Sequence, residues 1–329
     1  MKKRGWLFGG AVLLCVAAAV LSLCLGAARL TLAELWHAVS GGTSTAAGRI
    51  FYFARLPRTA ACFLAGAALA VSGCVIQGVL SNPLASPGII GVNSGAGLAV
   101  TLCCAAGAVS GWSVAIGAFL GAFLSVVLVV VCAEKCGSSR TTVILGGVAV
   151  NAFFNGLRDA LGSLVPEAGA MSGDFRVGDF SSVSHVRLIP AGILILAALT
   201  LVFTLHNELD VMALGEETAR GLGMNVHRSR WLLLGLAALL AGASVSFAGL
   251  LSFVGLIVPH VVRKLAGNET KILLPLCALF GSGFVTLADL AGRLAFSPYE
   301  LPVGIFLTVL GGPFFLWLLY KRRGGGYHD

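Results

Sequence analysis

Long segments without a charged residue alternate with short polar segments along the chain. The longest, residues 59–133, has 75 residues, whereas a transmembrane helix needs only about 20 apolar residues. This segment therefore fits three membrane-spanning helices, with predicted breaks at the turns 81–87 and 107–111. A second uncharged segment, residues 231–262, has 32 residues, which is long for one crossing and short for two. Gly249, Gly255 and Pro259 are the places where it is expected to break.

Five further apolar segments complete a prediction of about ten transmembrane helices: residues 5–28, 142–164, 188–205, 272–287 and 301–320. With ten crossings, all six lysines fall on one side of the membrane, which the positive-inside rule identifies as the cytoplasm. Both termini are then cytoplasmic. The longest loops are 165–187 on the outside and 207–230 in the cytoplasm. We therefore predict an all-α membrane protein in which residues 1–329 form a single transmembrane domain.

Composition agrees with this fold class. The chain is 57% hydrophobic and only 11% charged, whereas soluble proteins carry roughly 25% charged residues. The net charge of +8 does not indicate a nucleic-acid partner, because the positive residues lie in short loops where the positive-inside rule accounts for them. The nine cysteines form no CxxC pair, and we interpret them as free thiols that act as small apolar residues.

Sequence signatures of an enzyme are missing from the chain. It contains no G-x-x-x-x-G-K-[ST] motif for nucleotide phosphates and no H-E-x-x-H motif for zinc. Its six histidines are scattered, and His260 has no neighbour with metal-ligand spacing. We therefore expect no catalytic residue, no metal site and no cofactor on this chain.

Three polar residues recur at intervals of four on the fifth predicted span: Asn151, Asn155 and Asp159, with Arg158 alongside. Residues four apart share one face of a helix. Polar groups inside a membrane usually face a partner or a water-filled path, so this stripe is a candidate for the lining of a path. Hydrogen bonding between helices is the alternative. Ser139, Thr141 and Thr142, at the cytoplasmic start of this span, are candidates for an inner gate.

The cytoplasmic loop 207–230 contains a run of helix formers between glycines, Gly215 on one side and Gly221 with Gly223 on the other. A short helix between two hinges is the expected structure. A solvated connector is the alternative.

Arginines mark the outer ends of two predicted helices. Arg55 and Arg58 flank Pro57, which suits a first helical turn, but positive charge is unfavourable at a helix N-terminus. An external acidic partner would resolve this conflict, and anchoring to lipid phosphates is the alternative. Arg293 lies four residues after Asp289, so these two side chains can also pair within the helix.

Several of these segments resemble the permease subunits of ABC importers for iron–siderophore complexes, haem and cobalamin (FecCD type). The resemblance rests on the loop 214–223, on Ser252-Phe253-Val254-Gly255-Leu256-Ile257-Val258-Pro259-His260, and on the turn Asn82-Pro83-Leu84-Ala85. It covers nearly the whole chain. Ser86 stands where the family commonly has an acidic residue, and we assign the turn a structural role.

The resemblance implies partners and places roles on residues of this chain. It implies a homodimer or a dimer with a close paralogue in a bacterial or archaeal cytoplasmic membrane, with ATP and Mg bound by separate ATPase subunits. The ATPase would dock on Leu214, Gly215, Glu216, Ala219, Gly221, Leu222 and Gly223. An extracytoplasmic substrate-binding protein would dock on Arg55, Arg58 and Arg293. The path for the cargo would be lined by Asn151, Asn155, Arg158 and Asp159.

Two other classes of protein are alternatives to an ABC importer permease. An ion-coupled secondary transporter would show internal repeats and carboxylates near the middle of the membrane, but the carboxylates here lie in loops or near helix ends. An intramembrane enzyme would need a catalytic constellation. Ferric siderophore is the expected cargo because it is the commonest in the family, with cobalamin and haem as alternatives. The outer segment 175–180, Phe-Arg-Val-Gly-Asp-Phe, departs from the tryptophan and glycine-rich patch that the family often shows there.

Overall fold

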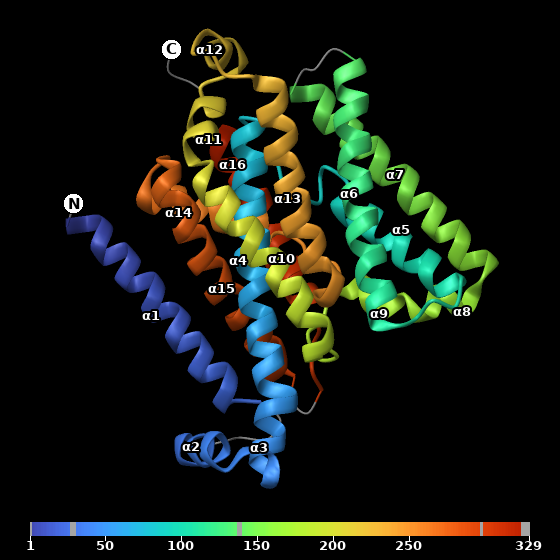
Figure 1. Ribbon diagram of the computed structural model, residues 1–329, viewed down its shortest axis with the longest axis vertical. Helices are drawn as coiled ribbons and strands as arrows, with labels where there is room; N and C mark the ends of the chain where they lie inside the picture. Colours follow the sequence, from blue (N-terminus) through green and yellow to red (C-terminus); the bar gives the residue numbers. More distant parts are fainter. Residues whose placement is uncertain (1, 27–30, 137–139, 297–298, 324–329) are drawn as a thin grey trace.

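The computed structural model describes residues 2–26, 31–136, 140–296 and 299–323, and these residues form helices and connecting segments without a strand. Ten helices within this part of the chain form a bundle (Figure 1). They are α1 (Lys2–Cys24), α4 (Leu56–Val79), α5 (Val92–Ala105), α6 (Gly111–Lys135), α7 (Arg140–Leu164), α10 (His185–Thr204), α13 (Val226–Ala248), α14 (Val254–Ala266), α15 (Thr270–Ala295) and α16 (Val303–Arg323). The all-α fold with about ten spans is confirmed.

Several helices of the bundle are long and apolar enough to cross a membrane. The described residues include six such helices, Arg4–Cys24, Ala46–Val79, Trp112–Cys132, His185–Thr204, Val226–Ala248 and Thr270–Ala295, and two shorter apolar ones, Val92–Ala105 and Val303–Leu316. The remaining two are α7, which carries the polar stripe, and the short α14. Which side of the membrane the termini face stays a prediction.

The uncharged segment 231–262 divides into two helices, as expected. The break between α13 and α14 contains Gly249, with a φ of 69°, and Phe253, with a φ of 66°. Gly255 and Pro259 do not break the helix, because both lie inside α14. At 1.5 Å per residue, the 13 residues of α14 span about 20 Å, less than the roughly 30 Å thickness of the hydrocarbon core. Helix α14 therefore covers about two thirds of that thickness, and it follows the irregular segment 249–253.

The second predicted helix begins earlier than expected. Residues Ala46–Val79 form one continuous helix made of α3 (Ala46–Ile50), a π-helical turn (Phe51–Arg55) and α4. The wide π-turn accommodates Pro57, which lacks an N–H and would otherwise clash with the preceding turn. Arg55 and Arg58 are thus inside a helix and not at its N-terminus. The predicted conflict with the helix dipole does not arise, so the dipole gives no reason to expect an acidic external partner.

Pairs of glycines bring three helix pairs into close contact. A Cβ atom built on Gly66 of α4 would lie 2.2 Å from the carbonyl oxygen of Gly281 on α15. Gly73 of α4 meets Gly255 of α14 in the same way, and Gly95 of α5 meets Gly121 of α6. Small residues allow such close approach of helix backbones in membrane proteins. Helix α4 is therefore the centre of the bundle, held against α14 and α15.

Replacing Gly66 with alanine is expected to lower the free energy of unfolding by about 1–3 kcal/mol, because the added methyl group forces α4 and α15 apart. Denaturation in mixed detergent micelles measures this. Gly235→Ala on α13 is the matched control, since a Cβ there meets nothing within 4 Å; it is expected to be neutral or slightly stabilising. Equal effects of the two substitutions would contradict the proposed contact.

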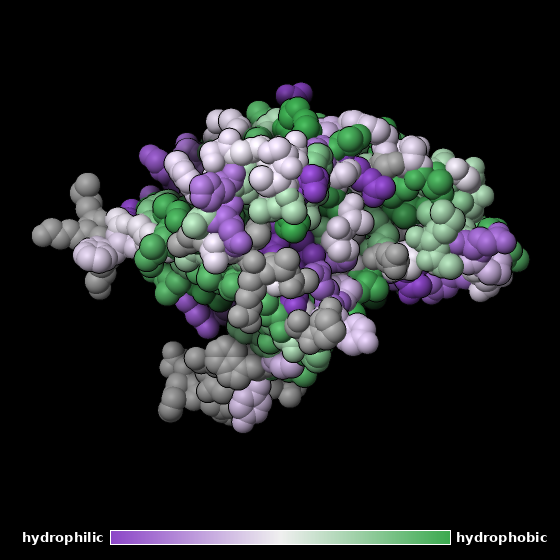
Figure 2. Space-filling model, turned by 90° about the horizontal axis from the view of Figure 1, so that it is seen from below, coloured by the Kyte–Doolittle hydropathy of each residue, from purple (hydrophilic) through white to green (hydrophobic). Residues whose placement is uncertain are grey.

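Several short helices outside the predicted spans were not anticipated. Helix α2 (Leu32–Gly41) has a capping box formed by Thr31 and Glu34, and α8 (Pro166–Met171) and α9 (Gly173–Val177) occupy the predicted outer loop. Helix α2 lies at the end of the molecule opposite α12 (Glu216–Gly221) (Figure 1). Figure 2 shows the face at the α2 end, where hydrophilic residues lie near the centre and also at several points of the rim, among hydrophobic ones. The two ends of the bundle thus carry different elements.

Candidate functional site

A cavity of about 490 Å³ lies between the turn 86–89, α7, the start of α14 and α16. Its polar lining includes Asn93, Asn151 and Asn155, and its apolar lining includes Phe253 and Phe315. The structure therefore brings two of the four predicted path residues to one cavity. The same cavity touches the break between α13 and α14, which supplies irregular backbone of the kind that membrane proteins tolerate where it lines a cavity.

Asn151 and Asn155 play different parts in this cavity. Asn151 Nδ2 donates to the carbonyl oxygens of Gly88 at 2.9 Å and Ile89 at 3.1 Å, so it holds the turn 86–89 against α7. Gly147, one turn earlier, allows the same approach, since a Cβ there would lie 2.2 Å from the Ile89 oxygen. Asn155 is half-buried and lines the cavity. The hydrogen-bonding alternative thus accounts for Asn151 and leaves Asn155 as the better candidate for contact with a cargo.

Arg158 and Asp159 belong to a separate cavity of about 300 Å³, with Thr101 and Arg176 among its lining residues. Arg158 and Asp159 pair with each other at 3.0 Å. Both cavities lie along α7, one turn apart. The predicted stripe therefore lines two chambers in succession, and its role in transport stays a prediction.

Ser139, proposed for the inner gate, falls outside the described residues. Thr141 and Thr142 are in the first turn of α7, which begins at Arg140. Thr142 is half-buried. The gate assignment stays a prediction.

Two of the three arginines that were predicted to face outside, Arg58 and Arg293, form a cluster with acidic residues of the same chain. Arg58 pairs with Asp289 at 3.0 Å and with Glu300 at 2.7 Å, and Asp289 also pairs with Arg293 at 3.1 Å. Only 1% of the Asp289 surface is exposed. The pairing of Arg293 with Asp289, left open by the sequence, is what the structure contains. This cluster ties α4 to α15 and to the segment before α16.

Access from outside differs among the three arginines. Arg55 and Arg293 are buried, with 6% and 4% of their surfaces exposed. Both donate to the end of α1: Arg55 to the Ser22 carbonyl oxygen at 3.2 Å and Arg293 to the Ser22 hydroxyl at 2.9 Å. The Arg58 side chain is 12% exposed. The expectation that all three present their charge to a partner is therefore corrected to Arg58 alone in this conformation.

The predicted coupling segment contains the expected short helix. Helix α12 (Glu216–Gly221) lies between Gly215 and Gly223, both with positive φ. Leu214 and Leu222 flank it, and each has 64% of its surface exposed. Figure 1 places α12 at the extreme end of the bundle. Two exposed leucines on a projecting turn are unusual for a solvated connector and suit a surface that another protein covers.

Glu216 anchors α12 to α13 through Arg230 at 2.7 Å, and it also pairs within α12 with Arg220 at 2.7 Å. Burial acts to raise the pKa of Glu216, but the hydrogen bond from Arg230 and the two positive charges together lower it below its usual range. The anchor is therefore complete above the carboxyl's ordinary pKa of about 4.3, and it is lost as the pH falls through the lowered value.

Ala219 differs from the other predicted coupling residues because it is fully buried. It packs with the apolar core, so a partner cannot touch its side chain. A large residue at this position would disturb the fold of α12, and the expectation that Ala219 is part of an exposed docking surface is corrected. Gly221 stays exposed, with nothing within 4 Å of an added Cβ.

Sequence reasoning missed two contributors to the cavities. Asn93 is in the first turn of α5 and Phe253 is the residue before α14. Phe253 combines a φ of 66° with close packing against Gly311 of α16, and a left-handed phenylalanine is rare. Among the described residues, no group of three or more His, Cys, Asp or Glu side chains is placed to hold a metal ion.

Comparison with known proteins assigns this architecture. The chain matches the FecCD transport family over residues 14–321. It is 37% identical to the iron(3+)-hydroxamate import system permease protein FhuB of Bacillus subtilis, over 97% of this chain and 84% of that protein. It is 35% identical to the vitamin B12 import system permease protein BtuC of Klebsiella pneumoniae, over 99% and 96%.

A solved structure described as an inward-facing conformation of a metal-chelate type ABC transporter superposes with a TM-score of 0.85 at 30% identity. The match covers 96% of this chain and 99% of the other. The chain is thus a transport subunit of the bacterial or archaeal cytoplasmic membrane. It belongs to the FecCD transport family of ABC importer permeases.

Proposed function

We propose that two copies of this chain enclose a path for a ferric siderophore, and that Asn155 and the break between α13 and α14 line it. The observation that carries this proposal is the cavity of about 490 Å³ on one side of α7. Helices α7 and α16 both expose large apolar residues, among them Leu145, Val148 and Val309. A second copy packed against these two helices would cover them and close the open side of the cavity.

ATP would be bound and hydrolysed by separate subunits that dock on α12. The exposed Leu214 and Leu222 support this assignment, because burying a leucine side chain under a partner stabilises the complex. An external binding protein would deliver the cargo at the opposite end of the bundle, near Arg58. Alternating access, driven by nucleotide, would then open each end of the path in turn.

Capture of the binding protein is expected to depend on the competition between Glu300 and the partner's carboxylates for Arg58. Glu300→Gln removes the internal competitor and should strengthen capture by up to about fivefold, the size of an exposed ion pair. Added salt should weaken wild-type capture, since exposed charges are screened beyond about 8–10 Å. Binding of the purified partner to the chain in nanodiscs measures both. If neither added salt nor Glu300→Gln changed the capture of the binding protein, Arg58 would have only a structural role.

The cargo assignment rests on base rates within the family. Identities of 37% to a hydroxamate permease and 35% to a vitamin B12 permease do not discriminate between these cargoes. Ferric siderophore is proposed because it is the commonest cargo, and cobalamin and haem are the alternatives. The cavity has both amide and aromatic lining residues, which suits a chelate with polar and apolar parts.

The test is to isolate the external binding protein that this chain captures and to identify its native ligand by mass spectrometry. The chain, the ATPase and the binding protein are then reconstituted in liposomes with that ligand inside or outside. A ferric siderophore that enters only with ATP supports the proposal. If the bound ligand were cobalamin or haem, that compound would be the cargo instead of a ferric siderophore. Uptake driven by an ion gradient without ATP would refute the mechanism.

A further inference from the structure

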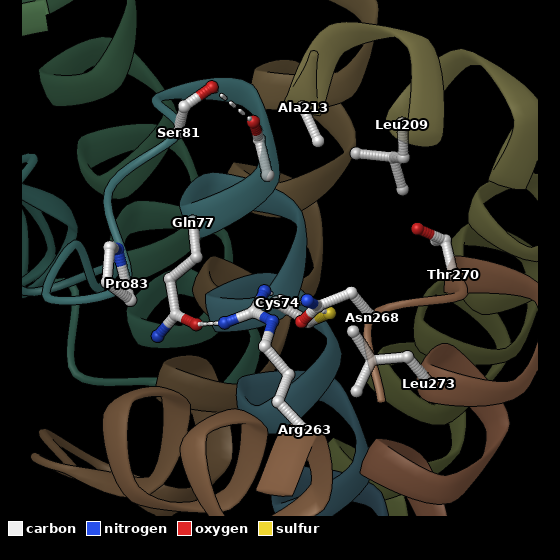
Figure 3. Close-up of a pocket in the computed structure, with 11 residues that line it drawn as sticks. Cys74, Gln77, Ser81, Pro83, Leu209, Ala213, Arg263, Asn268, Thr270 and Leu273 are labelled. Atoms are coloured by element: carbon white, nitrogen blue, oxygen red, sulfur yellow. Dashed lines mark hydrogen bonds between the residues drawn. The ribbon is translucent and has the colours of Figure 1, made fainter. Parts of the chain in front are cut away.

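A second polar cavity lies at the end of the bundle that carries α12, away from the cavity of the proposed path. It has a volume of about 250 Å³ and lies between the end of α4, α11 (His206–Ala213), the end of α14 and the start of α15. Figure 3 shows its lining, in which Arg263 reaches from α14 toward Gln77 with Asn268 close by, and Thr270 lies across the view near Leu209. Leu209 and Leu273 supply an apolar wall.

The positively charged guanidinium of Arg263 lies in this cavity, and its two side-chain partners are neutral. One terminal nitrogen donates to Gln77 Oε1, and the other contacts Cys74 Sγ at 3.8 Å. The side chain is half-buried, and it forms no ion pair with a carboxylate of the described residues. A guanidinium has five N–H donors and stays protonated, so three donors remain for another group. A half-buried cation without a counterion is costly at the edge of a membrane.

The charged groups around the cavity do not neutralise Arg263. Asp210 on α11 accepts from the Thr270 N–H at 3.1 Å and from the Thr270 hydroxyl. It is therefore engaged at the start of α15. Glu269 pairs with Arg4 at 2.6 Å. Lys264, the next residue along α14, is exposed and adds to the positive charge nearby.

We propose that this cavity binds a phosphate group, held by Arg263 with help from the Asn268 amide. Arginine matches the geometry of a phosphate with two parallel hydrogen bonds. At about 30 Å³ per water, the volume equals roughly eight waters, which fits one phosphate with part of its hydration. The phosphate comes either from free inorganic phosphate or from a lipid headgroup, because basic pockets between helices on the cytoplasmic side bind anionic headgroups.

This site is independent of the proposed cargo and of ATP-driven transport, so it can be tested on the isolated chain. The first arm is calorimetric titration of sodium phosphate into the protein in nonionic detergent, against sodium chloride of equal ionic strength. The second arm counts phosphatidylglycerol molecules that stay bound in native mass spectrometry after extraction from nanodiscs of phosphatidylglycerol and phosphatidylcholine. Binding in the first arm identifies free phosphate, and binding in the second alone identifies a headgroup.

Two variants probe the site from different directions. Arg263→Gln removes the cation and is expected to weaken binding at least tenfold. Asn268→Asp places a carboxylate beside Arg263 at an exposed position, where folding tolerates it, and is expected to weaken binding as strongly. Lys264→Gln removes the same charge one residue away, outside the cavity, and should change affinity less than about twofold.

The proposal is overturned if neither arm detects binding, or if Arg263→Gln and Lys264→Gln weaken it equally. It is also overturned if Arg263→Gln leaves both arms unchanged but weakens copurification with the ATPase, because a carboxylate of that partner would then be the occupant. Loss of binding in both Arg263→Gln and Asn268→Asp, with Lys264→Gln unaffected, supports it.

Discussion

Replacing Leu214 and Leu222 together with glutamate is expected to abolish ATP-driven uptake while the chain stays folded in the membrane. Both side chains are 64% exposed and flank α12, so their replacement removes no core contact. Burying one leucine at an interface contributes about 1.5–3 kcal/mol, and each 1.4 kcal/mol is a factor of ten in affinity. Loss of both, together with the burial of two new charges, should weaken ATPase docking at least about 100-fold. Copurification of the ATPase and uptake into liposomes measure this.

Lys135→Glu is the matched control for that double substitution. It changes the net charge by the same two units at an exposed position at the end of α6, and it should copurify with the ATPase at the wild-type yield. Ala219→Arg is not a suitable probe, because Ala219 is buried and its replacement would unfold α12. If the double leucine variant still bound the ATPase and transported, α12 would be a connector and the docking surface would lie elsewhere.

The second large effect is expected from Asp289→Asn. This carboxylate is 1% exposed and pairs with both Arg58 and Arg293. Removing its charge leaves two arginines near the outer end of α4 and α15 without their shared counterion. Breaking a buried ion pair from one side costs about 3–5 kcal/mol, so the variant should unfold at markedly lower denaturant concentration in micelles or fail to accumulate in the membrane.

Glu300→Gln is the control that removes an exposed carboxylate of the same cluster, whereas Asp289→Asn removes a buried one. Glu300 also pairs with Arg58, at 2.7 Å, but its side chain is 36% exposed, and exposed pairs contribute only about 0–1 kcal/mol. The free energy of unfolding of Glu300→Gln should therefore stay within about 1 kcal/mol of the wild-type value. Equal and small effects of Asp289→Asn and Glu300→Gln would mean that the arginines find other anions or water, and that the cluster does not hold α4 and α15 together.

Local pattern was sufficient to predict the helices of the bundle but not most of the short helices outside it. Uncharged length predicted the bundle, lysine parity predicted that residues 231–262 form two helices, and the glycines around 216–221 predicted α12. The sequence did not distinguish a proline or glycine that breaks a helix from one that lies inside a helix. Pro259 and Gly255 lie inside α14 because α14 packs on α4 through Gly73, and that contact joins residues 182 positions apart (255 − 73).

Long-range pairing accounts for most of what the sequence could not predict at the candidate sites. Arg58 meets Glu300, which is 242 residues away along the chain, and no local pattern indicates such a partner. The same holds for Arg263 and Gln77. Amphipathic spacing did predict that Asn151 and Asn155 share a face, but only the packed structure separates the residue that holds a turn from the residue that faces the cavity.

Cysteine accessibility on α7 tests the central claim most directly. In a background without the nine free cysteines, Asn155→Cys and Phe153→Cys are compared in the assembled transporter with a small charged thiol reagent. Phe153 points about 160° away from Asn155, at roughly 100° per residue. If the cavity is the path, Cys at position 155 reacts, its rate changes between nucleotide-free and ATP-bound states, and Cys at 153 reacts much less. Equal reaction at both positions, or none at 155 in either state, would contradict the assignment and move the path to other helices.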